Sequence, residues 1–138
     1  MVQLIAGGKG AGKTKRLIEL ANTAAKSSDG HIVFIDDDKR HIYDLNNNIR
    51  FVETSDFPLS NYREFIGFVS GILSQDYDII EIFVDGLTNI ITTIDNDAIV
   101  KLIARLEKLN AAHGVSFVIS INSEPETLPE EVRNLILA

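Results

Sequence analysis

The residues best suited to chemistry stand close together near the start of the chain, in the segment GGKGAGKTKR at residues 7–16. This segment holds four of the thirteen lysines and arginines and four of the nine glycines, although the whole chain has a formal net charge of -7. Glycines allow positive-φ backbone conformations, so that successive amide N–H groups point inward and bind an anion. A dense basic cluster in an acidic chain needs a local anion, and the segment therefore predicts a loop that wraps phosphate groups.

Residues 7–14 fit the pattern G-x-x-x-x-G-K-[ST] without exception. An apolar stretch at 2–6 precedes them and an amphipathic stretch at 14–26 follows, which gives the strand, turn and helix that the motif requires. We expect Lys13 to reach β and γ phosphates and the Thr14 hydroxyl to bind the Mg²⁺ ion that bridges them. The expected phosphate-binding residues are Gly7, Gly8, Lys9, Gly10, Ala11, Gly12, Lys13, Thr14 and Lys15.

Apolar runs and amphipathic stretches alternate along the rest of the chain, which predicts a parallel sheet flanked by helices, with ligands at the carboxyl ends of the strands. A capping-box pattern from Thr127 to Glu130 opens the last predicted helix. Residues 87–97 are interpreted either as a loop over the site or as the first turns of the following helix. Further strands are predicted at 31–36, 49–54, 78–86 and 115–122, and helices at 61–75, from 95–97 to 114, and at 127–137.

The motif and this alternation resemble the P-loop NTPase superfamily over essentially the whole chain. The resemblance implies one nucleotide-binding domain at residues 1–138 and an α/β fold, a three-layer α-β-α sandwich around a single, mostly parallel sheet of four to five strands. The branch stays open between the RecA-like and the kinase-like strand orders, with the RecA-like order favoured. In that order the first strand would lie at an edge, and an exposed apolar edge invites pairing with a protein partner or a second copy.

A P-loop needs an acid beside the magnesium ion, normally at the end of another apolar strand. Asp85 ends the run IIEIFVD at 79–85 and resembles the Walker B aspartate. Asp36 ends the apolar run at 31–36 and is the rival acid. We favour Asp85 as the metal ligand beside Thr14, because the metal acid comes later in the chain in both RecA-like ATPases and P-loop kinases.

The resemblance also suggests catalytic groups. Many related ATPases place a glutamate beside the Walker B aspartate to polarise water, but Gly86 occupies that position here. Asn122 stands at the tip of the last predicted strand and resembles the polar sensor of the γ phosphate, with a local turn as its alternative role. The catalytic candidates are therefore Lys13 and Asp85, with Glu53, Glu81, Asn122 and Asp36 as weaker ones.

ATP is favoured over GTP, because neither D-x-x-G after the metal strand nor N-K-x-D occurs in the chain. The first hypothesis is a Mg²⁺-dependent ATPase or an ATP-driven switch subunit. The second is a small-molecule kinase in which one of residues 36–38 binds or deprotonates an acceptor hydroxyl near Arg40, although no arginine-bearing lid is recognisable. The third is a module that binds the nucleotide without hydrolysis and signals to a partner.

The amino-acid composition limits the classes of function that remain. Twenty acidic residues against thirteen basic ones argue against binding to nucleic acid or anionic lipid. The chain contains no cysteine, which excludes disulfides and cysteine nucleophiles, and its three histidines are scattered. No apolar run approaches the roughly eighteen residues that cross a bilayer, and the N-terminus lacks a basic leader, so we expect a cytoplasmic protein without membrane contact.

Overall fold

The structure is a computed structural model, and residues 1–137 are described here. Within that range the chain forms one parallel five-stranded sheet, in the order β1-β5-β4-β2-β3. The predicted α/β fold class is confirmed, and each predicted strand is found within two residues of its expected bounds. The strands are β1 (Val2–Ala6), β2 (His31–Asp36), β3 (Ile49–Glu53), β4 (Ile79–Val84) and β5 (Ser116–Ile121).

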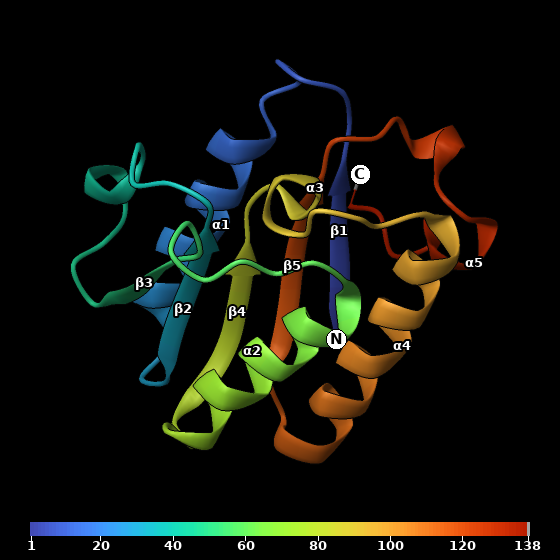
Figure 1. Ribbon diagram of the computed structural model, residues 1–138. Helices are drawn as coiled ribbons and strands as arrows, with labels where there is room; N and C mark the ends of the chain where they lie inside the picture. The colour runs from blue at the N-terminus through green and yellow to red at the C-terminus, as the bar shows by residue number, and fades with distance from the viewer. Residues whose placement is uncertain (138) are drawn as a thin grey trace.

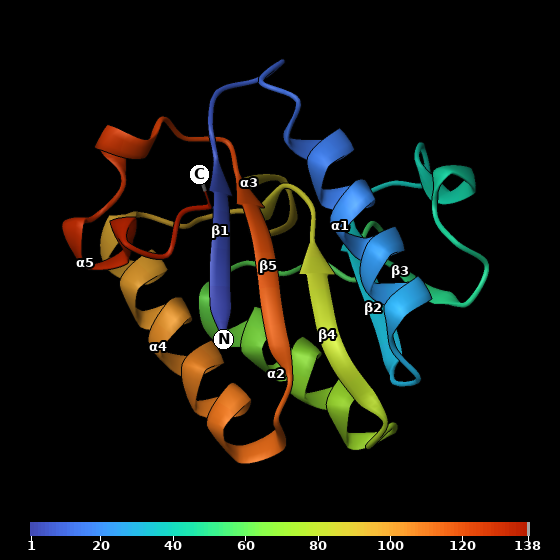
Figure 2. The same ribbon diagram turned by 180° about the vertical axis from the view of Figure 1, so that it is seen from behind.

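Helices cover both faces of the sheet and make the three predicted layers (Figures 1 and 2). Helix α1 (Lys13–Ser27) lies on one face, and α2 (Tyr62–Ser74) and α4 (Asn96–His113) lie on the other. Alternate residues of a strand pack against the two helical layers, because successive side chains of a strand point to opposite faces of the sheet. Phe34 packs in the layer of α1, whereas its neighbours Val33 and Ile35 pack in the layer of α2 and α4.

Local capping fixes where the two long helices of the second layer begin. The Asp95 side chain accepts a hydrogen bond from the amide of Ala98, 2.8 Å away, and so caps α4. The Asn61 side chain caps α2 in the same way, through the amide of Glu64 at 3.0 Å. These caps, together with the buried apolar faces of the helices, explain why the predicted bounds of α2 and α4 hold.

Residues 96–97 of the stretch 87–97 begin α4, but residues 87–95 follow neither of the two predicted courses. They form a separate one-turn helix, α3 (Leu87–Ile90), and then an isolated bridge between Ile91 and Leu59. Ile90 and Ile91 are buried and pack into the core, whereas the β-branched Thr92 and Thr93 are exposed.

The prediction of a helix over 127–137 is wrong. The Thr127 hydroxyl donates to the carbonyl of Glu124, and the only α-helical turn of this stretch is α5 (Glu130–Arg133), after a 3-10 turn, η2 (Pro125–Thr127). The segment 135–137 instead runs beside β1, where the amide of Leu4 donates to the carbonyl of Leu135 and the amide of Leu137 donates to the carbonyl of Leu4. The unpaired backbone N–H and C=O groups at the open edge of β1 gain hydrogen-bond partners when this segment is extended. The edge of β1 that was predicted to be exposed is therefore partly covered.

Among residues 1–137, the structure contains no helix with the length and apolar character that a bilayer crossing requires.

Candidate functional site

The loop between β1 and α1 lies at the carboxyl edge of the sheet, and glycine makes its course possible. Gly10 and Gly12 have φ values of 82° and 81°, a region that side-chain-bearing residues rarely adopt. Gly12 is the N-cap of α1 and offers no side chain to the helix, so the first amides of α1 are left available to an external anion. The loop predicted from the sequence therefore has the backbone of an anion site.

Lys13 brings a positive charge inside this loop. Its side chain folds back so that Nζ donates to the carbonyl oxygen of Gly8 at 2.7 Å, and the residue is only 8% exposed. A lysine held in this way sits beside the loop amides without competing with them, because it bonds to a carbonyl group.

Asp85 directly follows β4 and lies opposite the start of α1. The Thr14 hydroxyl lies 3.2 Å and 3.1 Å from its two carboxylate oxygens, and the Ser120 hydroxyl donates to one of them at 2.9 Å. The amide of Gly86 in turn donates to Ser120 Oγ at 2.7 Å. This chain of bonds fixes the Asp85 carboxylate facing α1, with a neutral hydroxyl on each side of it.

The acidic run after β2 contains three carboxylates in different surroundings. Asp36 is 3% exposed, and its Oδ1 accepts a bond from the amide of Asp37 at 2.7 Å, whereas no hydrogen-bond partner for Oδ2 lies within the described residues. Burial, with smaller contributions from the carboxyls of Asp37 and Asp85, raises the pKa of Asp36 to about 8. The Arg40 guanidinium bonds to Asp38 and lowers the pKa of that carboxyl.

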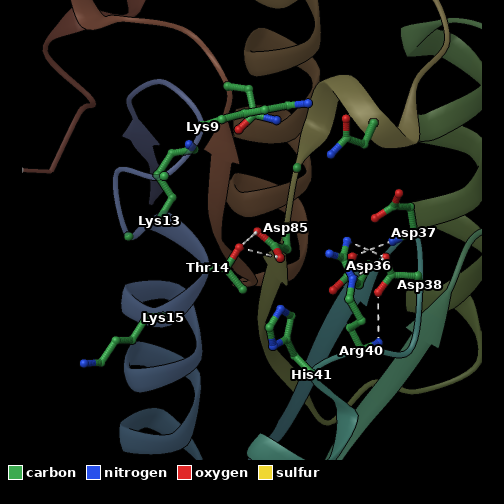
Figure 3. A pocket seen from close by; sticks show the side chains of 15 residues that line it. Lys9, Lys13, Thr14, Lys15, Asp36, Asp37, Asp38, Arg40, His41 and Asp85 are labelled. Carbon is green, nitrogen blue, oxygen red and sulfur yellow. Dashed lines mark hydrogen bonds and ion pairs between the residues drawn. The ribbon is translucent and has the colours of Figure 1, made fainter.

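These groups surround one cavity of about 460 Å³ (Figure 3). Among the predicted loop residues, Lys9, Gly10, Gly12, Lys13, Thr14 and Lys15 line it, although Figure 3 shows the Lys15 side chain directed away from the acids. Asp36, Asp85 and Asn122 line it from the sheet side. The other predicted loop residues, Gly7, Gly8 and Ala11, form the loop but do not line the cavity.

Two predicted glutamates lie elsewhere. Glu53 is at the end of the edge strand β3, where it bonds to Ser55 and lies 3.6 Å from Lys39 Nζ. Glu81 lies inside β4 opposite Ser116, at the amino end of the sheet, and burial raises its pKa. Neither lines the cavity, so the structure brings no predicted glutamate to the site.

Sequence reasoning missed two polar residues that the structure places here. Ser120 is fully buried and orients Asp85, and a serine near the carboxyl end of the apolar run VSFVISIN was the available indication. Glu124 places Oε1 3.1 Å from the amide of Gly8, so that a carboxylate of the chain occupies one loop N–H group. The bond depends on the path of the chain after β5, which no local pattern indicates.

The strand order places β5 between β1 and β4, which is the order expected of the RecA-like branch of P-loop proteins rather than of its kinase-like branch. The described residues thus form an α/β sandwich with this strand order. A search of the solved structures shows a likeness to the flagellar accessory protein FlaH from Methanocaldococcus jannaschii, with a TM-score of 0.63 and 15% sequence identity.

The likeness to FlaH covers 96% of this chain and 65% of that one, so this chain spans about two thirds of the length of FlaH. At this level of identity the comparison shows the fold alone. No protein-family model matches the sequence, and no curated protein matches it.

Proposed function

We propose that the chain binds ATP with Mg²⁺ in the 460 Å³ cavity and acts as a Mg²⁺-dependent ATPase or an ATP-driven switch subunit. The observation that carries this proposal is the convergence of Lys13, Thr14 and Asp85 at the mouth of a glycine loop, with the Thr14 hydroxyl 3.1 Å from Asp85. A triphosphate needs amide donors and a lysine, and its cation needs a hydroxyl and a carboxylate.

Each residue has a definite part in this proposal. The amides from Gly10 to Thr14 bind phosphate oxygens, and Lys13 exchanges the carbonyl of Gly8 for the β and γ phosphates. Thr14 and Asp85 hold Mg²⁺, which supplies charge neutralisation at the phosphates when it is bound. Ser120 keeps the Asp85 carboxylate turned toward the ion through its 2.9 Å bond.

Hydrolysis requires a group that orients water, and the carboxylates that line the cavity are all aspartates in the described part of the chain. Asp36 and Asn122 are the predicted candidates that remain in the cavity after Glu53 and Glu81 are placed elsewhere. More groups of the cavity therefore support ATP binding than support ATP hydrolysis. A switch that holds ATP without rapid hydrolysis is compatible with the same geometry.

A small-molecule kinase is the second candidate function, and one observation favours it. A cavity of about 390 Å³ adjoins the first and shares Thr14, Lys15 and His41 with it, so there is room for a second substrate beside the phosphates. Asp36, Asp38 and Arg40 line the wall of the first cavity near this junction. The RecA-like strand order opposes this alternative.

Calorimetry and phosphate release separate these functions. We expect ATP with Mg²⁺ to bind the wild type at a single site, Lys13→Ala to abolish binding and Lys26→Ala, which removes an exposed lysine from the far end of α1, to leave it unchanged. Release of ADP and phosphate without an acceptor indicates an ATPase. Release of ADP only with an acceptor, with the γ-phosphoryl group transferred to that acceptor, indicates a kinase. Binding without ADP formation indicates a switch. No binding of any nucleoside triphosphate to folded wild type contradicts all three.

A further inference from the structure

We propose that Asp36 and Asp85 bind a divalent cation together, in the absence of nucleotide, with the Thr14 hydroxyl as a third oxygen ligand. The proposal rests on the proposed nucleotide site, because the same ion would then meet the phosphates. It goes beyond that site in two ways. It assigns Asp36 as a metal ligand, and it makes the ion a resident of the free protein.

The sheet register places the two carboxylates side by side. Strands β2 and β4 are parallel neighbours in which Phe34 pairs with Phe83 and Ile35 pairs with Val84, and the amide of Asp85 donates to the carbonyl of Ile35 at 2.9 Å. The next residue of each strand is the acid. Neighbouring parallel strands lie about 4.8 Å apart, so one small cation can reach an oxygen from each acid.

Both acids point toward the α1 side of the sheet. Phe34 and Phe83 pack in the core layer of α1, and side chains two residues further along a strand point to the same face. The hydrogen bonds between Asp85 and Thr14, which lies on the first turn of α1, confirm that the Asp85 side chain points to this side. The two carboxylates and the hydroxyl therefore enclose one space, which Figure 3 shows between α1 and the acidic run.

The charges in this space favour a bound cation. Asp36 and Asp85 are 3% and 8% exposed, and the donors to them are the neutral groups Thr14, Ser120 and the amide of Asp37. Two of the basic side chains that line the cavity bond elsewhere, since Lys13 bonds to the carbonyl of Gly8 and Arg40 bonds to Asp38. Two adjacent buried carboxylates are costly without a compensating charge.

The free oxygen of Asp36 gives the second, independent argument. Asp36 Oδ2 is buried without a hydrogen-bond partner in residues 1–137, and the residue lines the cavity. Buried polar atoms in folded proteins nearly always have a partner, and an exception points to a ligand. The ligand set is all oxygen, with two carboxylates and a hydroxyl, which suits Mg²⁺ or Mn²⁺.

The test is titration of Mn²⁺ into the chelator-treated, nucleotide-free full chain, followed by electron paramagnetic resonance, with Mg²⁺ as competitor. We expect one saturable site with a dissociation constant below about 1 mM. Asp36→Asn and Asp85→Asn should each weaken the site at least about tenfold. Asp29→Asn is the matched control, because it removes one charge from an exposed residue that does not line the cavity, and it should change affinity by less than about twofold.

Circular dichroism of each variant separates loss of the ion from loss of the fold. Asp36→Asn keeps the oxygen that accepts from the amide of Asp37, so it should fold. The proposal is overturned if wild type binds no Mn²⁺ without nucleotide, or if Asp36→Asn binds it as tightly as wild type. An ATP titration in parallel distinguishes the two proposals: ATP–Mg²⁺ binding without nucleotide-free Mn²⁺ binding refutes this one alone, and Mn²⁺ binding without ATP binding refutes the proposed function alone.

Discussion

Strand β2 begins at one acidic cluster and ends at another, and the two differ in how their charge is balanced. At its start, His31 Nδ1 lies 2.6 Å and Arg50 Nη1 lies 2.9 Å from the same oxygen of Asp76. The hydrogen bond with His31, aided by Arg50, lowers the pKa of Asp76. At its end, Asp36 lies beside Asp85 with no cation bonded to it, and its pKa rises to about 8.

The difference separates a carboxylate that holds the fold together from one that is available to a ligand. Asp76, His31 and Asp78 place three ligand atoms within 4.8 Å of one another, as a metal site would. The Arg50 guanidinium already supplies a positive charge at the shared oxygen, so an ion pair explains that cluster. Asp36 has no such partner, and a buried polar group without one costs about 1–3 kcal/mol.

Among substitutions that compare the two ends of the sheet, the largest expected effect is on nucleotide binding. Asp85→Asn should weaken ATP–Mg²⁺ binding about 100-fold, because the cation loses a charged ligand beside Thr14 and a buried charge–charge contact contributes a few kcal/mol. Asp78→Asn, at the opposite end of the sheet, should leave binding unchanged. Calorimetry measures both variants, and equal affinity in the two would contradict the assignment of Asp85.

The next effect concerns the stability of the fold. Substitutions of the acids at the two ends of β2 should change stability in opposite directions. Asp36→Asn should raise the free energy of unfolding of metal-free protein at pH 8 by about 1–3 kcal/mol, because it removes an uncompensated buried charge. Asp76→Asn should lower the melting temperature, because it removes the carboxylate that pairs with His31 and Arg50. Chemical denaturation in a chelator measures both, and destabilisation by both variants would show that Asp36 is a structural acid after all.

A third prediction sharpens the contrast through pH. The pKa of Asp36 is about 8 in the folded chain against an ordinary value of 3.8, so between these values the folded state holds a proton that the unfolded state has released. Stability of metal-free wild type should therefore fall as pH rises from about 4 to 8 and level off above pH 8. The difference between wild type and Asp36→Asn, followed by thermal denaturation, isolates this effect. If the difference in stability between wild type and Asp36→Asn does not change with pH, the raised pKa of Asp36 is contradicted.

The smallest effect is expected at an exposed carboxylate. Glu124 accepts a bond from the loop amide of Gly8 and brings a negative charge toward the phosphate site. Glu124→Gln keeps an oxygen acceptor and removes the charge, so ATP should bind about two- to fivefold more tightly, in keeping with the small energy of exposed charges. Salt titration provides the control, since the gain should shrink as ionic strength rises. Weaker binding would instead give Glu124 a positive role in holding the loop.

The sequence predicted the glycine loop and the strand that precedes Asp85, because both depend on local patterns. A buried parallel strand is a continuous apolar run, so β2 was predicted to the residue, and the glycine motif is recognisable by spacing alone. The edge segment at 135–137 was misassigned as helix, because its extended form depends on the backbone of Leu4, which is distant in the sequence. Long-range pairing decides such segments, and local propensity does not.

The contrast between the acids could not be predicted for the same reason. Asp36, Asp37 and Asp38 are identical as letters, and only the register with β4 buries the first while Arg40 neutralises the third. The strand order also required the structure, because it depends on β5 inserting between β1 and β4. Which carboxylates meet thus depends on the pairing of the strands, whereas the glycine loop is recognisable from local spacing.

A crystal structure of the full chain with Mn²⁺ and a non-hydrolysable ATP analogue tests the central claim most directly, because the anomalous scattering of Mn²⁺ locates the ion independently of the nucleotide. We predict that the triphosphate lies inside the loop at 7–14, that Lys13 Nζ has left Gly8 for a phosphate oxygen, and that the ion lies between Thr14 and Asp85. A nucleotide bound elsewhere, or an ion that contacts neither Thr14 nor Asp85, would contradict the account.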